Sequence, residues 1–391
     1  MDAPHHHPQG RTRFIAGTMT GTSIDGDLDA ALVEISGQGL AMRPRLVAAG
    51  AWPLGALADD LRRIASGEPA TARELARIAR AFGEAHAQAL DELCQGAGVQ
   101  PDLAVLHGQT VFHAPPLSWQ LLDPWPVAVR IGCRVRYDLR SANTASGGQG
   151  APITPLADFV LFADDHDARL VVNLGGFINL TAVPPRAEGI SAIRGFDLCA
   201  CNHLLDRVAR QRLGVAFDRD GEAAGRGCCD EDLAERISHA IAPVAAPSGS
   251  GRTARRSLGT GDEAGRLVDL TAGLQPEDAC RTIVESIALA AARTISAEAP
   301  GEFRALLVAG GSARNRALRD ALSRRCRLDV QTTEESHGIP VHMREPAEIA
   351  ILGALAEDGV RYSLPQVTGV RSLVPESAVI EAPRDRRLPT V

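Results

Sequence analysis

Alternating apolar and polar stretches predict strands and helices in turn. The apolar runs of residues 14–35 and 43–54 are short and bounded by polar residues, which predicts strands, and a Gly/Thr/Ser-rich turn divides the first run in two. Over residues 71–97 the apolar positions recur every three or four residues, which indicates an amphipathic helix. The same two patterns continue along the chain, so we expect an α/β fold with mixed sheets.

Later segments repeat the design of the first. Residues 170–183 read as two strands joined by a double glycine, as residues 14–35 read as two strands joined by a polar turn. This repetition predicts a second lobe built on the same plan. The remaining expected elements are a strand entering a polar turn (103–115), a strand, loop and helix (137–162), helices (202–213, 280–298 and 346–358), and a buried strand, GG turn and helix (305–325).

The length supports two lobes. A single hydrophobic core stops growing at roughly 250–300 residues, and this chain has 391. We place the N-terminal lobe at residues 11–168 and the C-terminal lobe at residues 169–391, and leave open that the tail, residues 363–391, packs back on the N-terminal lobe. Two lobes also imply a cleft.

Composition excludes several classes of partner. The formal net charge of -7 offers no basic surface for nucleic acid or an anionic membrane. The eight cysteines are scattered, and the sequence contains neither a signal peptide nor a long apolar span. We therefore expect a cytoplasmic protein with reduced thiols and no nucleic-acid or membrane partner.

The chain contains no lysine, so all 41 of its basic residues are arginine. This excludes the P-loop lysine, the protein-kinase strand lysine and a Schiff-base lysine. A bound phosphate would have to be held by backbone amides, hydroxyls, arginine or a metal ion.

Three glycine turns follow apolar runs, after Ala16, Leu174 and Ala309. Backbone N–H groups in such turns can cradle an anion. One turn alone favours ordinary hairpin geometry, because glycine is common there. Three turns in a lysine-free chain favour a nucleotide, with two turns for phosphates and the third for adenosine.

The motifs resemble one family in order and spacing. They are "GTMTGTSIDGDLDAAL", "HGQTVFHAP", "DLRSANTASGGQGAPITP", "VVNLGGFINLT", "GFD" before "CN", "DRDGEAA", "LLVAGGSARNRAL" and "REPAEIAILGALA". This pattern is similar to that of the anhydro-N-acetylmuramic acid kinases, and levoglucosan kinases are relatives. The resemblance implies a two-lobed actin/hexokinase-like (ribonuclease-H-like) fold with a central cleft, ATP and Mg²⁺ in that cleft, and a homodimer.

The resemblance also implies a reaction and its residues. The family splits a 1,6-anhydro bridge with water while phosphorylating O6, which recycles cell-wall sugar. Asp197 matches the family's general base and Glu345 is assigned to its substrate-facing glutamate, while Asp25 would orient Mg²⁺, through water. The residues expected to bind ATP are Gly17, Thr18, Gly21, Thr22, Ser23, Asp25, Gly26, Asn173, Gly175, Gly176, Gly310, Gly311 and Asn315, and those expected to contact the sugar are His107, Gln109, Thr110, Arg140 and Gln149.

The chain departs from the family directly after the proposed base, where "DLCACN" replaces "DTGPGN". Losing two glycines and a proline changes what the backbone can adopt. The departure keeps two alternatives open: a kinase of the same fold for another sugar-like substrate, and an ATP-binding homologue with little turnover. A zinc site at Cys199, Cys201, Cys228 and Cys229 is disfavoured because neither spacing is C-x-x-C. A glycan-binding module without nucleotide would leave the three glycine turns to coincidence.

Overall fold

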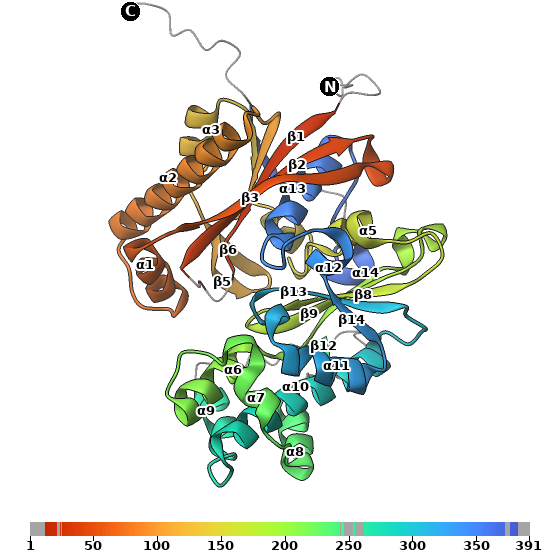
Figure 1. Ribbon diagram of the computed structural model, residues 1–391. Coiled ribbons are helices and arrows are strands. Elements are labelled where there is room, and N and C mark those ends of the chain that lie inside the picture. Colours follow the sequence, from red (N-terminus) through yellow and green to blue (C-terminus); the bar gives the residue numbers. More distant parts are fainter. Residues whose placement is uncertain are drawn as a thin grey trace, which may run out of the picture. The chain divides into compact units, whose positions relative to one another are not determined.

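The computed structural model describes residues 12–21, 24, 26–242, 244–245, 253–254, 262–371 and 376–381. Contacts divide the chain into two compact units, which we call unit 1 (Met1–Leu161 with Met343–Val391) and unit 2 (Phe162–His342). The predicted α/β class is confirmed (Figure 1). The sequence-based boundary at residues 168/169 differs from this division chiefly because the helix after residue 343 packs on the strands of unit 1.

The sheet of unit 1 has the strand order β15-β7-β4-β1-β2-β3. β1, β2 and β3 form an antiparallel meander, β4 pairs in parallel with β1, and β7 pairs in parallel with β4. β15, from the tail of the chain, pairs antiparallel with β7 at the edge. The bounds are β1 (Arg13–Met19), β2 (Asp27–Ser36), β3 (Arg43–Pro53), β4 (Leu103–Leu106), β7 (Arg134–Tyr137) and β15 (Ala378–Ile380).

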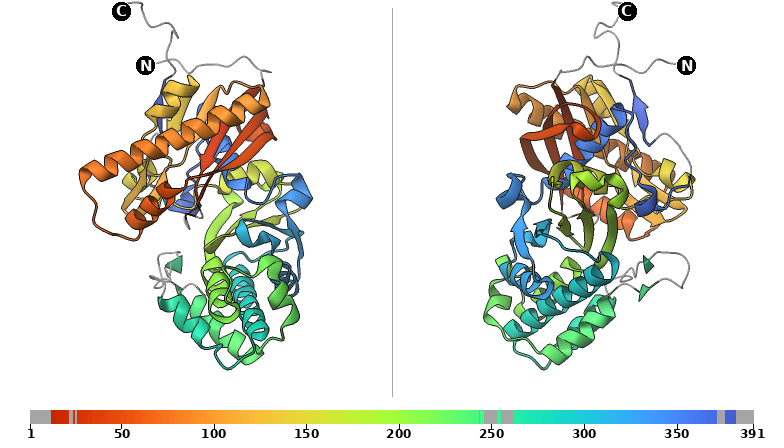
Figure 2. Two further views of the ribbon diagram at one scale, coloured as in Figure 1. Left: turned by 60° about the vertical axis from the view of Figure 1, so that its left-hand side comes forward. Right: turned by 90° about the vertical axis from the view of Figure 1, so that its right-hand side faces the viewer.

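Helices and a hairpin complete unit 1. The long helix α2 begins at a capping box made by Thr71 and Glu74 and ends at Gly98, which adopts a left-handed conformation. Figure 2 shows α2 lying along the strands of this unit. The elements are α1 (Ala56–Ala65), α2 (Ala72–Ala97), α3 (Trp125–Ile131), α4 (Ser141–Ala145), α5 (Pro155–Phe162), α13 (Arg344–Glu357), α14 (Pro365–Thr368) and the hairpin β5 (Gln109–Ala114) and β6 (Leu117–Leu121).

The sheet of unit 2 has the strand order β10-β9-β8-β13-β14. β8, β9 and β10 form an antiparallel meander, β13 pairs in parallel with β8, and β14 pairs in parallel with β13. The arrangement repeats that of β1, β2, β3, β4 and β7, as in ribonuclease-H-like folds, so the predicted second lobe on the same plan is confirmed. The bounds are β8 (Arg169–Leu174), β9 (Phe177–Val183), β10 (Arg194–Ala200), β13 (Ala305–Ala309) and β14 (Asp329–Thr332).

The core of unit 2 lies between this sheet and its helices. Helix α10 is buried along most of its length because small and β-branched residues occupy nearly every side of it. The helices are α6 (Asn202–Val208), α7 (Glu222–Arg226), α8 (Glu231–Ile241), α9 (Asp262–Asp269), α10 (Pro276–Glu298), α11 (Arg316–Cys326) and α12 (Thr333–His337). Among the residues that the structure describes, no helix is long and apolar enough to span a membrane.

Candidate functional site

A row of polar side chains crosses the sheet of unit 2. The strand register pairs Asn173 with Asn179, and Asn179 with Asp197, so the three side chains lie on one face. Asn179 Nδ2 donates a hydrogen bond to Asp197 Oδ1 at 3.2 Å. A β-bulge follows Asp197, and bulges commonly re-aim a side chain next to an active site. Asn179 therefore holds the predicted base Asp197 in place. Asn179 was not among the predicted site residues.

The glycine turn between β8 and β9 adjoins this row. Its two carbonyls, on Gly175 and Gly176, accept hydrogen bonds from the backbone N–H groups of Asn202 and Cys201 at the start of α6. A Cβ on Gly176 would lie 2.8 Å from His203 Nε2. Because this contact is with the end of a side chain, an added Cβ would displace the His203 ring rather than the backbone of α6.

The third glycine turn meets the same row. Gly310 has φ +89°, and a Cβ there would lie 2.5 Å from Asn173 Oδ1. That oxygen is buried and makes no hydrogen bond within the described residues. The next turn continues the polar surface, because Ser312 Oγ donates to Asn202 Oδ1 at 2.6 Å. Unit 2 thus brings five predicted residues together, namely Asn173, Gly175, Gly176, Asp197 and Gly310, with Gly311 next in sequence.

The "LCAC" segment after Asp197 belongs to the hydrophobic core of unit 2. Leu198, Cys199, Ala200 and Cys201 are all at most 5% exposed. Burial raises the pKa of the Cys199 thiol to about 12 and that of Cys201 well above its ordinary value. Among the described residues no group of three or more His, Cys, Asp or Glu side chains could hold a metal ion. The cysteines therefore act as apolar packing residues.

Asn315 is the N-cap residue of helix α11. Its Oδ1 accepts a hydrogen bond from Leu318 N–H at 2.9 Å and so caps helix α11. A Cβ on Gly221 would lie 2.1 Å from the same oxygen. Beside this cap is a pocket of about 260 Å³, lined by Asp220, Gly221, Glu222, Gly225, Arg281, Arg316, Ala317 and Asp320.

In unit 1 the predicted residues gather where β1 and β4 end. These strands are parallel, so the residues after them leave the same edge of the sheet. Thr20 Oγ1 donates to Gln109 Oε1 at 2.6 Å, and Arg140 Nε donates to His107 Nε2 at 2.9 Å. The predicted residues Thr22, Ser23 and Asp25 lie outside the described residues.

Two buried histidines stand at this edge. Thr18 Oγ1 and His86 Nδ1 are 2.8 Å apart, and burial lowers the pKa of His86 to about 3. Burial and the neighbouring Arg140 guanidinium lower the pKa of His107 well below its ordinary value. His86 Nε2 and His107 Nδ1 have no hydrogen-bond partner of good geometry within the described residues. Both imidazoles are therefore neutral, and His86 was not indicated by any motif.

The glycine-rich loop after α4 is fixed to the tail of the chain. Asn143 Nδ2 donates to Thr368 Oγ1 at 2.9 Å, and Asn143 Oδ1 accepts from Gly150 N–H at 2.7 Å. The backbone N–H of Gln149 donates to the Thr368 carbonyl. Nearby, Gln120 Nε2 donates to Thr110 Oγ1 at 3.2 Å. The backbone N–H of Gln149 and the hydroxyl of Thr110 therefore have hydrogen-bond partners within unit 1.

Helix α13 brings charged side chains to unit 1. Gly17 packs against its backbone, since a Cβ there would lie 2.1 Å from the Pro346 carbonyl oxygen. The packing gives Gly17 a structural role, and its contact with phosphate stays a prediction. Glu345 lies in the first turn of the helix and is partly buried.

Glu348, one turn further along α13, is a carboxyl that the sequence interpretation missed. It is fully buried, and Arg344 Nε lies 2.7 Å from its Oε1. Arg344 also pairs with the buried Asp158 at 2.6 Å. Burial raises the pKa of Glu348 well above its ordinary value; Arg344 opposes this rise and Asp158 adds to it. A glutamate within an otherwise apolar helix pattern was the feature that could have identified it.

Known proteins match nearly the whole chain. A model of the family described as anhydro-N-acetylmuramic acid kinase matches residues 12–381. The anhydro-N-acetylmuramic acid kinase of Bordetella pertussis is 35% identical over 95% of this chain and 97% of that protein. The enzyme of the same name from Chromohalobacter salexigens is 34% identical over 91% of this chain and 96% of that protein.

Solved structures give a more distant likeness. Component A of the (R)-2-hydroxyglutaryl-CoA dehydratase of Acidaminococcus fermentans has a TM-score of 0.46 at 15% identity, over 89% of this chain and 99% of that one. A ROK family glucokinase from Streptomyces griseus, in complex with glucose and AMPPNP, has a TM-score of 0.39 at 14% identity, over 87% and 98%. Structural similarity at these TM-scores supports no conclusion beyond those from the sequence matches.

Proposed function

Because the chain belongs to the anhydro-N-acetylmuramic acid kinase family, we propose that it uses ATP to phosphorylate O6 of 1,6-anhydro-N-acetylmuramic acid while water opens the anhydro bridge. The protein is a phosphotransferase of cell-wall recycling. The observation that carries the assignment of the site is the row Asn173, Asn179 and Asp197 beside two glycine turns.

Asp197 is the proposed general base. A carboxylate takes the proton from the water that attacks the anomeric carbon if it is aimed at that water. The hydrogen bond from Asn179 and the bulge after Asp197 support such a fixed aim. The bridge oxygen then leaves as O6 and takes the phosphoryl group, a transfer that depends on positioning and charge neutralisation.

The glycine turns of unit 2 are the proposed nucleotide site. ATP supplies the phosphoryl group when it is bound. The buried Oδ1 of Asn173 has no hydrogen-bond partner among the described residues and can only accept, so it suits a donor such as a ribose hydroxyl. The pocket beside Asn315, with Arg281 and Arg316 on its wall, is a proposed position for the adenosine.

The sugar site is proposed at the β1/β4 edge of unit 1, with His107, Gln109, Thr110, Arg140 and Gln149. A neutral His107 whose Nε2 accepts from Arg140 holds the guanidinium in one orientation, which suits recognition of hydroxyl or carboxylate oxygens. Glu345 is the proposed carboxylate from α13, and the buried Glu348 is a second carboxyl on the same helix. The proposed Mg²⁺ residue, Asp25, lies outside the described residues, so that proposal rests on the family resemblance. A homodimer is proposed on the same basis, whereas a cytoplasmic location is proposed from the sequence composition described above.

The assignment is tested by phosphorus NMR of ATP, Mg²⁺ and 1,6-anhydro-N-acetylmuramic acid with the purified protein. We expect a sugar 6-phosphate with the wild type and a loss of rate of at least about 100-fold in Asp197→Asn, because removal of a general base commonly costs 10²–10⁴-fold. Asp165→Asn is the matched control, since Asp165 is exposed on a loop of unit 2.

Absence of product with the wild type would contradict the assignment of the substrate. Other anhydro sugars, levoglucosan first, are then the next acceptors to test. The "LCAC" segment favours this alternative most, because it replaces two glycines and a proline of the family's motif directly after Asp197. ATP binding without transfer to any sugar would instead indicate a homologue with little turnover.

A further inference from the structure

Helix α2 carries a stripe of exposed charges along one side. Its residues recur every three or four positions, so they lie on a single face over roughly 28 Å, at 1.5 Å per residue. In order along the helix, the exposed members of the stripe are Arg73, Arg77, Arg80, Glu84, Gln88 and Glu92. The first three are basic, and both charged members of the second half are acidic.

This order is complementary to itself when reversed. If two copies of α2 lie antiparallel about a two-fold axis midway along the stripe, Arg73 faces Glu92, Arg77 faces Gln88 and Arg80 faces Glu84. A two-fold interface needs this kind of self-complementary surface. Within the chain Arg80 pairs with Glu84 at 2.9 Å and Arg77 with Asp60 at 2.7 Å, and Glu92 accepts from Trp52 Nε1 at 2.7 Å. Arg80 and Glu84 are more than half exposed, so contacts across the axis would be shared with these pairs.

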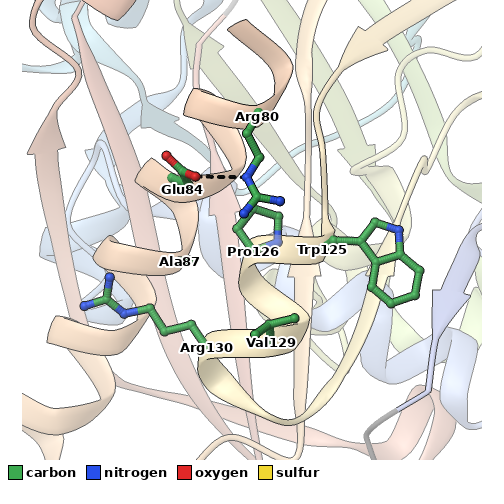
Figure 3. Close-up of a pocket in the computed structure, with 7 residues that line it drawn as sticks. All are labelled: Arg80, Glu84, Ala87, Trp125, Pro126, Val129 and Arg130. Atoms are coloured by element: carbon green, nitrogen blue, oxygen red, sulfur yellow. Dashed lines mark hydrogen bonds and ion pairs between the residues drawn. The ribbon is translucent and has the colours of Figure 1, made fainter. Parts of the chain in front are cut away.

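An apolar ridge lies beside the middle of the stripe. In α3, Trp125 is 57% exposed and Val129 is 78% exposed. Between this ridge and α2 is a pocket of about 220 Å³, lined by Arg80, Glu84, Ala87, Trp125, Pro126, Val129 and Arg130 (Figure 3). An exposed tryptophan and arginines around a pocket are the composition of interface hot spots, which cluster at the centre of an interface with charges outside them.

From these observations we infer that the α2/α3 face of unit 1 is the surface through which two copies of this chain associate, with α2 antiparallel to its copy and Trp125 of each copy seated at the partner's pocket. The occupant is a second copy because the charge pattern complements its own reversal. An unrelated partner would need no such symmetry. The inference names the surface of the homodimer proposed above and does not depend on which sugar is the substrate.

The test uses the full chain in three forms: wild type, Arg73→Glu and Glu92→Arg. Sedimentation equilibrium gives the dimer dissociation constant, and we expect it to rise at least tenfold in each single variant. In a homodimer of either variant, residues 73 and 92 that face each other carry charges of the same sign at both ends of the stripe, so both contacts are repulsive. In an equimolar mixture of the two variants, both end contacts of the mixed dimer become attractive. The mixture is therefore expected to regain the wild-type dimer content, as heterodimers that native mass spectrometry distinguishes by mass.

Trp125→Ser tests the apolar part of the surface, with Trp119→Ser as its control. Trp119 is 46% exposed but lies on β6, away from the stripe and from the pocket lining. We expect only Trp125→Ser to weaken the dimer, again at least tenfold. Circular dichroism of each variant separates loss of association from loss of folding.

Three results would overturn the inference: a monomeric wild type, a dimer that no variant weakens, and single variants that weaken the dimer without recovery in the mixture. Association is read without substrate or ATP. Phosphoryl transfer is assayed separately on the same samples, so failure of the dimer and failure of the proposed function are distinguishable.

Discussion

His86 shows how one buried side chain ties stability to pH. Burial holds the folded pKa near 3, whereas an unfolded histidine titrates near 6.5. Between these values the unfolded state binds more protons, so stability is full above pH 6.5 and falls as the pH is lowered. At about 1.4 kcal/mol per pKa unit, His86 alone accounts for a loss of about 3 kcal/mol between pH 7 and pH 4.

A double variant isolates this contribution. Thr18→Val with His86→Phe removes the histidine and its hydroxyl partner together, and the new ring can pack at Phe82, which already contacts His86 edge to face. Urea unfolding at pH 7 and pH 4 is expected to show a loss of stability about 3 kcal/mol smaller than in the wild type. Parallel losses in the two proteins would contradict the burial argument. The exposed His166→Gln controls for loss of a histidine as such.

At the scale of single elements, helix α13 depends on one glycine in β1. A Cβ on Gly17 would lie 2.1 Å from the Pro346 carbonyl oxygen and 2.6 Å from the Ala350 nitrogen. Both are backbone atoms, so relief requires the helix to move. We expect Gly17→Ala to lower the free energy of unfolding by about 3 kcal/mol, as overpacking of a core does. Thermal unfolding followed by circular dichroism measures the change.

Gly96→Ala in α2 is the matched control, because nothing lies within 4 Å of the added Cβ. That substitution is expected to stabilise the protein by about 0.5–1 kcal/mol through helix propensity. Equal effects of the two substitutions would indicate that α13 is free to shift and that Gly17 is not required for packing.

The sequence predicted elements better than their assembly. The strand, glycine turn and strand over residues 14–35 and 170–183 follow from local patterns, since apolar runs and glycine punctuation act within a few residues. The row Asn173, Asn179 and Asp197 depends on strand register, which periodicity does not reveal. Glu348 was missed because a lone glutamate in a helix reads as surface, whereas here tertiary packing buries it beside Arg344.

At the scale of the whole molecule, the chain enters and leaves unit 2 once. Unit 2 is the continuous segment Phe162–His342 with its own core, whereas unit 1 is completed only when the chain returns at Met343. The missing piece matters because α13 packs on β1, β2 and β4, and a Cβ on its Gly353 would lie 2.2 Å from Val105. The two halves of unit 1 therefore share one core, and a domain needs its own core to fold alone.

This difference predicts unequal fragments. Residues 162–342 expressed alone are expected to unfold cooperatively on heating and to give dispersed amide resonances, because their sheet and α10 are complete. Residues 1–161 are expected to be largely unfolded, because the face of β1 that receives α13 is exposed. Joining residues 1–161 to 343–391 through a short Gly/Ser linker is expected to restore folding, since Asp158 and Arg344 are in contact and hold the two ends together. A folded 1–161 fragment would show that α13 is dispensable for unit 1, and an unfolded 162–342 fragment would show that unit 2 depends on unit 1.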